Sequence, residues 1–244
     1  MSKEQNSRIF IPDHASLKQE LEEILWLIVL EGADGTGKTT LARVLWRRLE
    51  KILGTLIPIF SFPSPTAKMM LDRLSKETPP EDRQLVFTRF FITDFMRYLP
   101  AIRQHRGICI FDRFVLSTLV YQYFRFPVPD RDERVLQDVE AFLAELEQYT
   151  MRMQTFILTG SAEMLKYRIE MRGEGITMFE KDIETVVRGY GDANDFAKKF
   201  DLLSQRHIVP IKKDGEELLT EELCQQVVKD SLGFLETSRN REAS

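Results

Sequence analysis

Gly32-Ala33-Asp34-Gly35-Thr36-Gly37-Lys38-Thr39-Thr40 fits the pattern G-x-x-x-x-G-K-[ST]. The apolar run before it, Ile24 to Leu30, predicts a buried strand, and residues 39–51 after it have apolar positions at helical spacing. Glycines allow backbone N–H groups to surround a polyphosphate, and the lysine brings a positive charge to its β and γ oxygens. The threonine hydroxyl can bind Mg²⁺. Strand, glycine loop and helix therefore predict a phosphate-binding loop.

The whole loop is assigned to binding of the donor nucleotide. We expect its lysine to lie in an exposed loop and to contribute little to the core. The assigned residues are Gly32, Ala33, Asp34, Gly35, Thr36, Gly37, Lys38, Thr39 and Thr40.

Length and charge limit the class of protein. A chain of 244 residues with 43% hydrophobic residues can bury one sizeable core, so we expect a single domain over residues 24–236. Residues 1–23 form an N-terminal extension and residues 237–244 a frayed tail in this interpretation. The net charge of −4 indicates a nucleotide as the anionic ligand and excludes a protein that wraps a nucleic acid polymer.

Cysteine content and hydrophobic runs bear on location. Cys109 and Cys224 are too few for a disulfide framework, which favours a reduced, cytoplasmic protein. The apolar run near the N-terminus is shorter than the ~20 residues of a membrane helix, and residues 1–7 lack the layout of a signal peptide. We expect neither a membrane contact nor export.

Short apolar strands alternate with helical patterns along the chain. This alternation predicts an α/β fold, with a parallel sheet of about five strands and helices on both faces. A loop is expected over residues 63–66, because its two prolines fix the backbone and remove donors. Further strands are expected over residues 55–62, 108–111, 156–158 and 208–211, and helices over 67–76, 85–104, 135–149, 162–172, 183–200 and 221–232.

A second motif follows the third predicted strand. Asp112-Arg113-Phe114 is followed by Ser117 and by Val120-Tyr121-Gln122. Together with the glycine loop, this stretch resembles the thymidylate kinase family. Looser similarities extend the resemblance over most of residues 25–232; they are Phe62-Pro63, Arg172-Gly173, and Val187, Arg188 and Tyr190. The resemblance implies a P-loop NTPase fold and a nucleoside monophosphate kinase that uses ATP and Mg²⁺.

The resemblance also implies roles on the donor side. Lys38, Asp112, Arg113 and Arg172 would be catalytic, and Thr39 and Asp112 would hold the metal. The loop lacks the arginine that some relatives carry, and in such relatives basic groups lie in a mobile lid. Here Arg168, Arg172 and Lys181 flank residues 173–178, within a lid expected over residues 170–184. Our hypothesis is that Arg172 and Arg168 close over the triphosphate and exclude water.

On the acceptor side the match to the family is incomplete. Phe91 stands where an arginine is expected four residues after the stacking aromatic, and Ser64-Pro65 replaces the arginine that usually follows Phe-Pro. Arg89 or Arg97 could supply the lost contact to the acceptor phosphate. The acceptor residues implied by the resemblance are Asp34, at the sugar 3′-hydroxyl; Phe87, stacked on the base or packed in the core; and Phe62, Arg89, Arg113, Ser117 and Gln122.

Three functions remain open at this point. The favoured one moves the γ-phosphoryl group of ATP to a deoxynucleoside monophosphate, with dTMP as the acceptor and a homodimer as the assembly. A deoxynucleoside kinase would suit the missing arginines, but its sites usually carry a carboxylate base near the acceptor hydroxyl. A catalytically inactive or regulatory P-loop module is the third, and the lack of an Asn-Lys-x-Asp motif disfavours its GTP-binding form.

Overall fold

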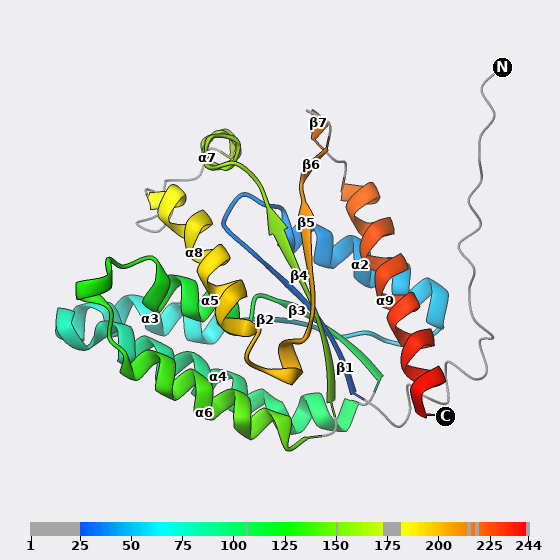
Figure 1. Ribbon diagram of the computed structural model, residues 1–244, viewed down its shortest axis with the longest axis horizontal. Coiled ribbons are helices and arrows are strands. Elements are labelled where there is room, and N and C mark those ends of the chain that lie inside the picture. The colour runs from blue at the N-terminus through cyan, green and yellow to red at the C-terminus, as the bar shows by residue number, and fades with distance from the viewer. Residues whose placement is uncertain are drawn as a thin grey trace.

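A parallel five-stranded sheet forms the centre of the protein (Figure 1). The computed structural model describes residues 25–105, 107–149, 151–172, 182–213, 216–217 and 220–242. The strands lie in the order β2-β3-β1-β4-β5. Their bounds are Leu25–Gly32 for β1, Ile59–Ser61 for β2, Gly107–Asp112 for β3, Met151–Thr159 for β4 and Gln205–Pro210 for β5. The α/β architecture predicted from the sequence is confirmed.

Strands β1 and β3 are buried along their whole length, as expected for a sheet covered on both faces. β2 is shorter than the predicted 55–62. Gly54 ends the preceding helix in a left-handed conformation, Leu56 is exposed, and Pro58 has no N–H for a ladder bond. Strand pairing therefore begins with Ile59. β4, in contrast, extends well beyond the predicted 156–158.

Helices cover both faces of the sheet. Figure 1 shows α2 and α9 on one side, and α4, α5, α6 and α8 on the other. The helices span Lys38–Leu53 (α2), Pro65–Glu77 (α3), Arg83–His105 (α4), Val115–Leu119 (α5), Arg134–Glu147 (α6), Ala162–Met171 (α7), Ile183–Ala197 (α8) and Thr220–Glu242 (α9). Short turns of 3₁₀-helix lie at Pro80–Asp82, Val128–Asp130 and Asp201–Leu203, and a π-helical turn, η2, spans Val120–Phe124.

Two helical segments differ from the sequence prediction. The predicted loop over residues 63–66 is half helix, because Ser64 caps α3 and Pro65 occupies its first position, where the missing N–H costs nothing. α9 continues through residues predicted as a frayed tail, which contain good helix formers and neither glycine nor proline. A small antiparallel pair, β6 (Lys212–Lys213) and β7 (Glu216–Glu217), was not predicted.

The topology places a ligand site beside β1. The chain leaves β1 toward β2 on one side, whereas β4 lies on the other side of β1. In such sheets ligands bind outside the carboxyl ends of the strands, where the strand order reverses. The phosphate loop follows β1, and Asp112 and Arg113 follow the neighbouring β3. Among the described helices, none is long and apolar enough to span a bilayer.

Candidate active site

The glycine loop is closed tightly against β4 and α7. Gly32 has a φ of 138°, and a Cβ there would lie 2.5 Å from the carbonyl oxygen of Leu158, so this position requires glycine. The Arg168 guanidinium of α7 donates to the Gly35 carbonyl at 3.3 Å. Arg168, predicted to contact the donor nucleotide, is therefore brought to the loop itself and supports its backbone.

Lys38 lies inside the loop rather than in an exposed position, which corrects the sequence expectation. Its side chain is buried, and Nζ donates to the Ala33 carbonyl at 2.7 Å and to Thr36 Oγ1 at 3.3 Å. Burial lowers the pKa of Lys38 to about 7, and the nearby charge of Arg113 acts in the same direction. A polyphosphate would add anionic oxygens as partners of the ammonium group and favour its charged form.

Thr39 and Asp112 meet as predicted for a metal site. The Thr39 hydroxyl donates to Asp112 Oδ2 at 2.6 Å, which joins the first turn of α2 to the end of β3. A hydroxyl and a carboxylate fit Mg²⁺, which prefers oxygen ligands and binds through one or two carboxylates together with substrate phosphates. These two side chains are our candidates for holding the ion.

Asp34 and Arg113 form an ion pair that connects the loop to the end of β3. Arg113 NH2 donates to Asp34 Oδ1, and the Tyr121 hydroxyl donates to Asp34 Oδ2 at 2.9 Å. Burial opposes ionisation of Asp34, but Arg113 and then Lys38 outweigh it and lower its pKa. Arg113 also reaches Ser117 Oγ at 3.4 Å. Three residues predicted for the acceptor site thus meet, together with Tyr121, to which the sequence analysis gave no role.

Glu31 is the main residue that the sequence analysis missed. This fully buried carboxyl at the end of β1 accepts from the backbone N–H groups of Phe114 at 2.9 Å and Ser117 at 3.1 Å. It also accepts from the Ser117 hydroxyl, which lies 2.8 Å from the Tyr190 hydroxyl. Glu31, on β1, therefore caps the N-terminus of α5. The available signal was a lone acidic residue closing an apolar strand directly before the phosphate loop.

Substitution of Glu31 tests this capping role. Burial raises the pKa of Glu31 above 4.5, although hydrogen bonds from Ser117 counteract the rise. As the pH rises above 4.5, the Glu31 carboxyl ionises in the unfolded chain before it ionises in the folded protein. The stability that protonated Glu31 contributes is therefore lost as the pH rises through its folded-state pKa. Glu31→Gln has no such titration. The free energy of unfolding of Glu31→Gln, measured by urea denaturation, should therefore rise relative to that of the wild type between pH 4.5 and pH 7.

The control is Glu163→Gln, at an exposed position of α7. Glu31→Ala should lose about 2–4 kcal/mol at either pH, because two buried backbone N–H groups lose their acceptor. A stability difference between Glu31→Gln and the wild type that did not change with pH would contradict this description of Glu31.

The aromatic residues predicted for the acceptor site lie in two environments. Phe62 is buried, with its ring centroid 5.3 Å from that of Phe95 and 5.4 Å from that of Phe111. It is a member of the aromatic core, and its assignment to the substrate stays a prediction. Phe87 is half-buried on α4, four residues before Phe91 and on the same face. The stacking role of Phe87 stays a prediction.

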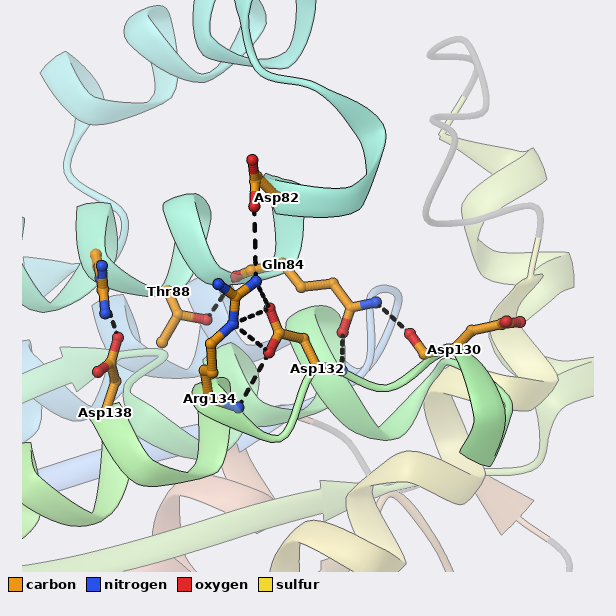
Figure 2. A network of polar contacts seen from close by, with 8 residues as sticks. Asp82, Gln84, Thr88, Asp130, Asp132, Arg134 and Asp138 are labelled. Atoms are coloured by element: carbon orange, nitrogen blue, oxygen red, sulfur yellow. Dashed lines mark hydrogen bonds and ion pairs between the residues drawn. The ribbon is translucent and has the colours of Figure 1, made fainter.

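Arg89, a candidate to replace the missing acceptor arginine, is bound to a carboxylate of a neighbouring helix. Its Nε donates to Asp138 of α6 at 2.7 Å, and this hydrogen bond and the nearby charge of Asp138 raise the pKa of the guanidinium. Figure 2 also shows a separate group of contacts, in which Arg134 of α6 binds Asp132, just before that helix, and Asp82 of the 3₁₀ turn that precedes α4. Arg89 therefore joins α4 to α6, and its assignment to the substrate stays a prediction.

The remaining predicted residues are only partly placed. Arg172, at the end of α7, is exposed, and its charge is the smallest of the contributions that lower the pKa of Asp34. Gln122 is buried in η2, one turn beyond Thr118. Lys181 and lid residues 173–180 lie outside the described residues. The catalytic role of the lid arginines stays a prediction.

Comparisons with known proteins agree with this arrangement. The family model described as thymidylate kinase matches residues 30–190. The chain is also similar to the crystal structure of thymidylate kinase from Ehrlichia chaffeensis, with a TM-score of 0.55 and 20% sequence identity, over 84% of this chain and 97% of that chain. The structural likeness shows the fold, and the family match includes both the glycine loop and the Asp112-Arg113 motif. The chain belongs to the thymidylate kinase family, whose activity is the ATP-dependent phosphorylation of dTMP.

Proposed function

We propose that this protein transfers the γ-phosphoryl group of ATP to dTMP, and that Asp34, Arg113 and Ser117 hold the acceptor. The observation that carries the proposal is the ion pair between Asp34, inside the donor loop, and Arg113, at the end of β3. It brings groups suited to two nucleotides to one place: loop amides and Lys38 for a triphosphate, and a carboxylate, a guanidinium and a hydroxyl for a sugar and a phosphate.

The reaction needs positioning and charge neutralisation more than covalent chemistry. An oxygen of the acceptor phosphate attacks the γ-phosphorus, a P–O bond forms, and the bond to the β-phosphate oxygen breaks to release ADP. Lys38 neutralises the charge on the β and γ oxygens, and the loop N–H groups orient them. Arg113 lies between the two halves of the site and can bind the acceptor phosphate while Asp34 accepts from a sugar hydroxyl.

Mg²⁺ is the group that the family implies, and Thr39 and Asp112 would hold it. When bound, it neutralises phosphate oxygens and orients them for in-line transfer. Arg172 would add a further positive charge at the loop when the lid closes. Exclusion of water by this closure would suppress hydrolysis of ATP.

A deoxynucleoside kinase is the alternative, and its site would need a carboxylate near the acceptor hydroxyl to take the proton. Asp34 and Glu31 are carboxyl groups at this site. Asp34 accepts from Arg113 and Tyr121, and Glu31 accepts from two backbone N–H groups and the Ser117 hydroxyl. The assay below decides between the two acceptors.

An assay of ADP release tests the proposal. ATP and Mg²⁺ are supplied with a panel of nucleoside monophosphates and the corresponding nucleosides. We expect ADP release to depend on dTMP and to produce dTDP. ADP release independent of any acceptor would refute the kinase function, and dependence on thymidine but not on dTMP would establish the alternative.

Replacement of Asp34 separates the two halves of the site. We expect Asp34→Ala to raise the KM for dTMP or lower kcat by roughly 10- to 100-fold, because one hydrogen-bonding partner of the acceptor and the anchor of Arg113 are lost. Binding of ATP, measured by calorimetry, should change little. A loss confined to ATP affinity would place Asp34 on the donor side instead.

The cellular location and the assembly complete the proposal. Cys109 and Cys224 are both buried free thiols, which suits a reducing compartment such as the cytoplasm. A homodimer stays a prediction from the family resemblance.

A further inference from the structure

Tyr190 of α8 is buried beside the proposed acceptor site and has no role in the proposed mechanism. Its side chain is 4% exposed, and its hydroxyl lies 2.8 Å from Ser117 Oγ. Ser117 belongs to α5 and lies 73 residues earlier in the chain. Tyr190 therefore connects α8 to the polar network of the site.

The other contacts of Ser117 fix the direction of this hydrogen bond. A serine hydroxyl has one proton and two lone pairs. Ser117 donates its proton to Glu31 Oε2, so the Tyr190 hydroxyl must be the donor to Ser117 Oγ. The other lone pair faces Arg113, whose NH1 donates to Ser117 Oγ at 3.4 Å. The Ser117 hydroxyl is thus oriented by groups from β1, from α8 and from the residue that follows β3.

The phenol of Tyr190 keeps the proton that this contact requires. Burial raises the pKa of Tyr190 well above its ordinary value, and the nearby charge of Glu31 acts in the same direction. The charge of Arg113 opposes this rise but does not cancel it. At neutral pH Tyr190 is therefore a hydrogen-bond donor to Ser117.

Packing holds α8 against η2 next to Tyr190. A Cβ built on Gly189 would lie 3.2 Å from Val120 Cγ1 of η2, which is closer than an ordinary van der Waals contact. The two segments therefore approach each other as closely as a glycine allows. η2 also carries Tyr121, whose hydroxyl donates to Asp34. The close packing thus fixes two tyrosines of the site relative to each other.

Arg113 lies between two partners, and a tyrosine hydroxyl binds each of them. Its NH2 donates to Asp34 Oδ1, and its NH1 donates to Ser117 Oγ. Tyr121 donates to the other carboxylate oxygen of Asp34, and Tyr190 donates to Ser117. A guanidinium group is planar, so binding at both of its ends determines its orientation.

We propose that Tyr190 is a positioning residue for phosphoryl transfer: its hydroxyl orients Ser117, and Ser117 in turn orients the Arg113 guanidinium toward the acceptor phosphate. This inference rests on the proposed function. Without the Tyr190 hydroxyl, one end of the guanidinium loses its oriented partner. A misplacement of about 1 Å in a positioning group can reduce the rate by about 10²-fold.

Tyr190→Phe removes the hydroxyl and keeps the buried ring. We expect kcat/KM for dTMP to fall by roughly 10- to 100-fold, because the Arg113 guanidinium is less well oriented. The Kd of ATP, measured by calorimetry, should change by less than about 2-fold, since Lys38 and the loop N–H groups are untouched. Assays of ADP release with the full-length protein, ATP and Mg²⁺ measure kcat/KM, and urea denaturation verifies that the variant is folded.

Tyr123→Phe is the matched control. Tyr123 is 5% exposed, and its hydroxyl also donates to a neighbour, the carboxylate of Glu133 at the start of α6. The same atom is therefore removed from an equally buried tyrosine that makes no contact with Ser117 or Arg113 among the described residues. We expect Tyr123→Phe to retain the wild-type kcat/KM for dTMP.

A double-mutant cycle with Ser117→Ala distinguishes positioning from a purely structural role. If Tyr190 acts through Ser117, Tyr190→Phe should change kcat/KM by less than about 3-fold when Ser117 is already alanine. A general loosening of α8 would instead lower kcat/KM by the same factor in both backgrounds. An equal loss in the two backgrounds would therefore overturn the inference.

The outcomes separate this inference from the function on which it rests. Wild-type kcat/KM in folded Tyr190→Phe would overturn the inference and leave the dTMP kinase function intact. A loss in Tyr190→Phe that is confined to ATP affinity would also overturn it. Absence of dTMP-dependent ADP release by the wild-type protein would overturn both.

Discussion

Lys38→Met should lower kcat/KM for dTMP phosphorylation by roughly 10³-fold, because the ammonium group is the cation placed inside the phosphate loop. The Lys38 side chain is buried, and its Nζ is already directed into the loop by Ala33 and Thr36. It therefore needs little reorganisation when the triphosphate binds. Methionine retains the length of the side chain and removes the charge, so steady-state kinetics report the electrostatic contribution.

The folded protein should tolerate this substitution. Burial disfavours the charged form of Lys38 and lowers its pKa to about 7, and the Ala33 carbonyl keeps Thr36 as a partner. The free energy of unfolding without nucleotide should therefore equal or exceed that of the wild type.

Lys51→Met is the matched control, since Lys51 is exposed in the last turn of the same helix. We expect normal turnover in this variant. Near-normal turnover in Lys38→Met would remove Lys38 from the catalytic machinery.

Local sequence determined the donor half of the site well. The glycine loop, the strand before it and the helix after it are contiguous, so residues 25–53 could be predicted without knowledge of distant contacts. The meeting of Thr39 with Asp112 was implied by the family resemblance, and sheet topology explains it, because the carboxyl ends of parallel strands lie at one edge of the sheet.

The acceptor half depends on contacts that no local pattern encodes. Glu31 and Ser117 are 86 residues apart, and Ser117 and Tyr190 are 73 apart. Arg89 was assigned to the substrate because it lay nearest in sequence to the missing arginine, but Asp138 on another helix holds it. Phe62 was assigned by motif and is buried by the aromatic core. Motif matching identified this region, whereas tertiary packing determines which of its side chains meet.

Loss of Arg113 should reduce turnover as strongly as loss of Lys38, by roughly 10³-fold or more, because a guanidinium that stabilises phosphoryl transfer is worth this much. Arg113 binds Asp34 and Ser117 and lies with its guanidinium carbon 5.3 Å from the centre of the Tyr121 ring. Arg113→Lys should recover little activity, since a lysine cannot bond to two partners in one plane. Steady-state kinetics with dTMP and ATP measure both variants.

The backbone of Arg113 provides a second, independent readout. Its φ is 74°, in the left-handed region that costs an L-residue roughly 1–2 kcal/mol, and it is the one non-glycine residue with positive φ in the described part of the chain. Arg113→Gly and Arg113→Ala remove the same guanidinium, but only glycine relieves the strain. Both should be inactive, with Arg113→Gly the more stable by about 1 kcal/mol in urea denaturation.

Equal stability of the glycine and alanine variants would show that the backbone is not strained there. Full activity in Arg113→Gly would show that the guanidinium is not needed. The expected combination, a more stable backbone with no turnover, would mean that the protein maintains an unfavourable conformation at this residue because it directs the guanidinium to the junction of the two nucleotide sites.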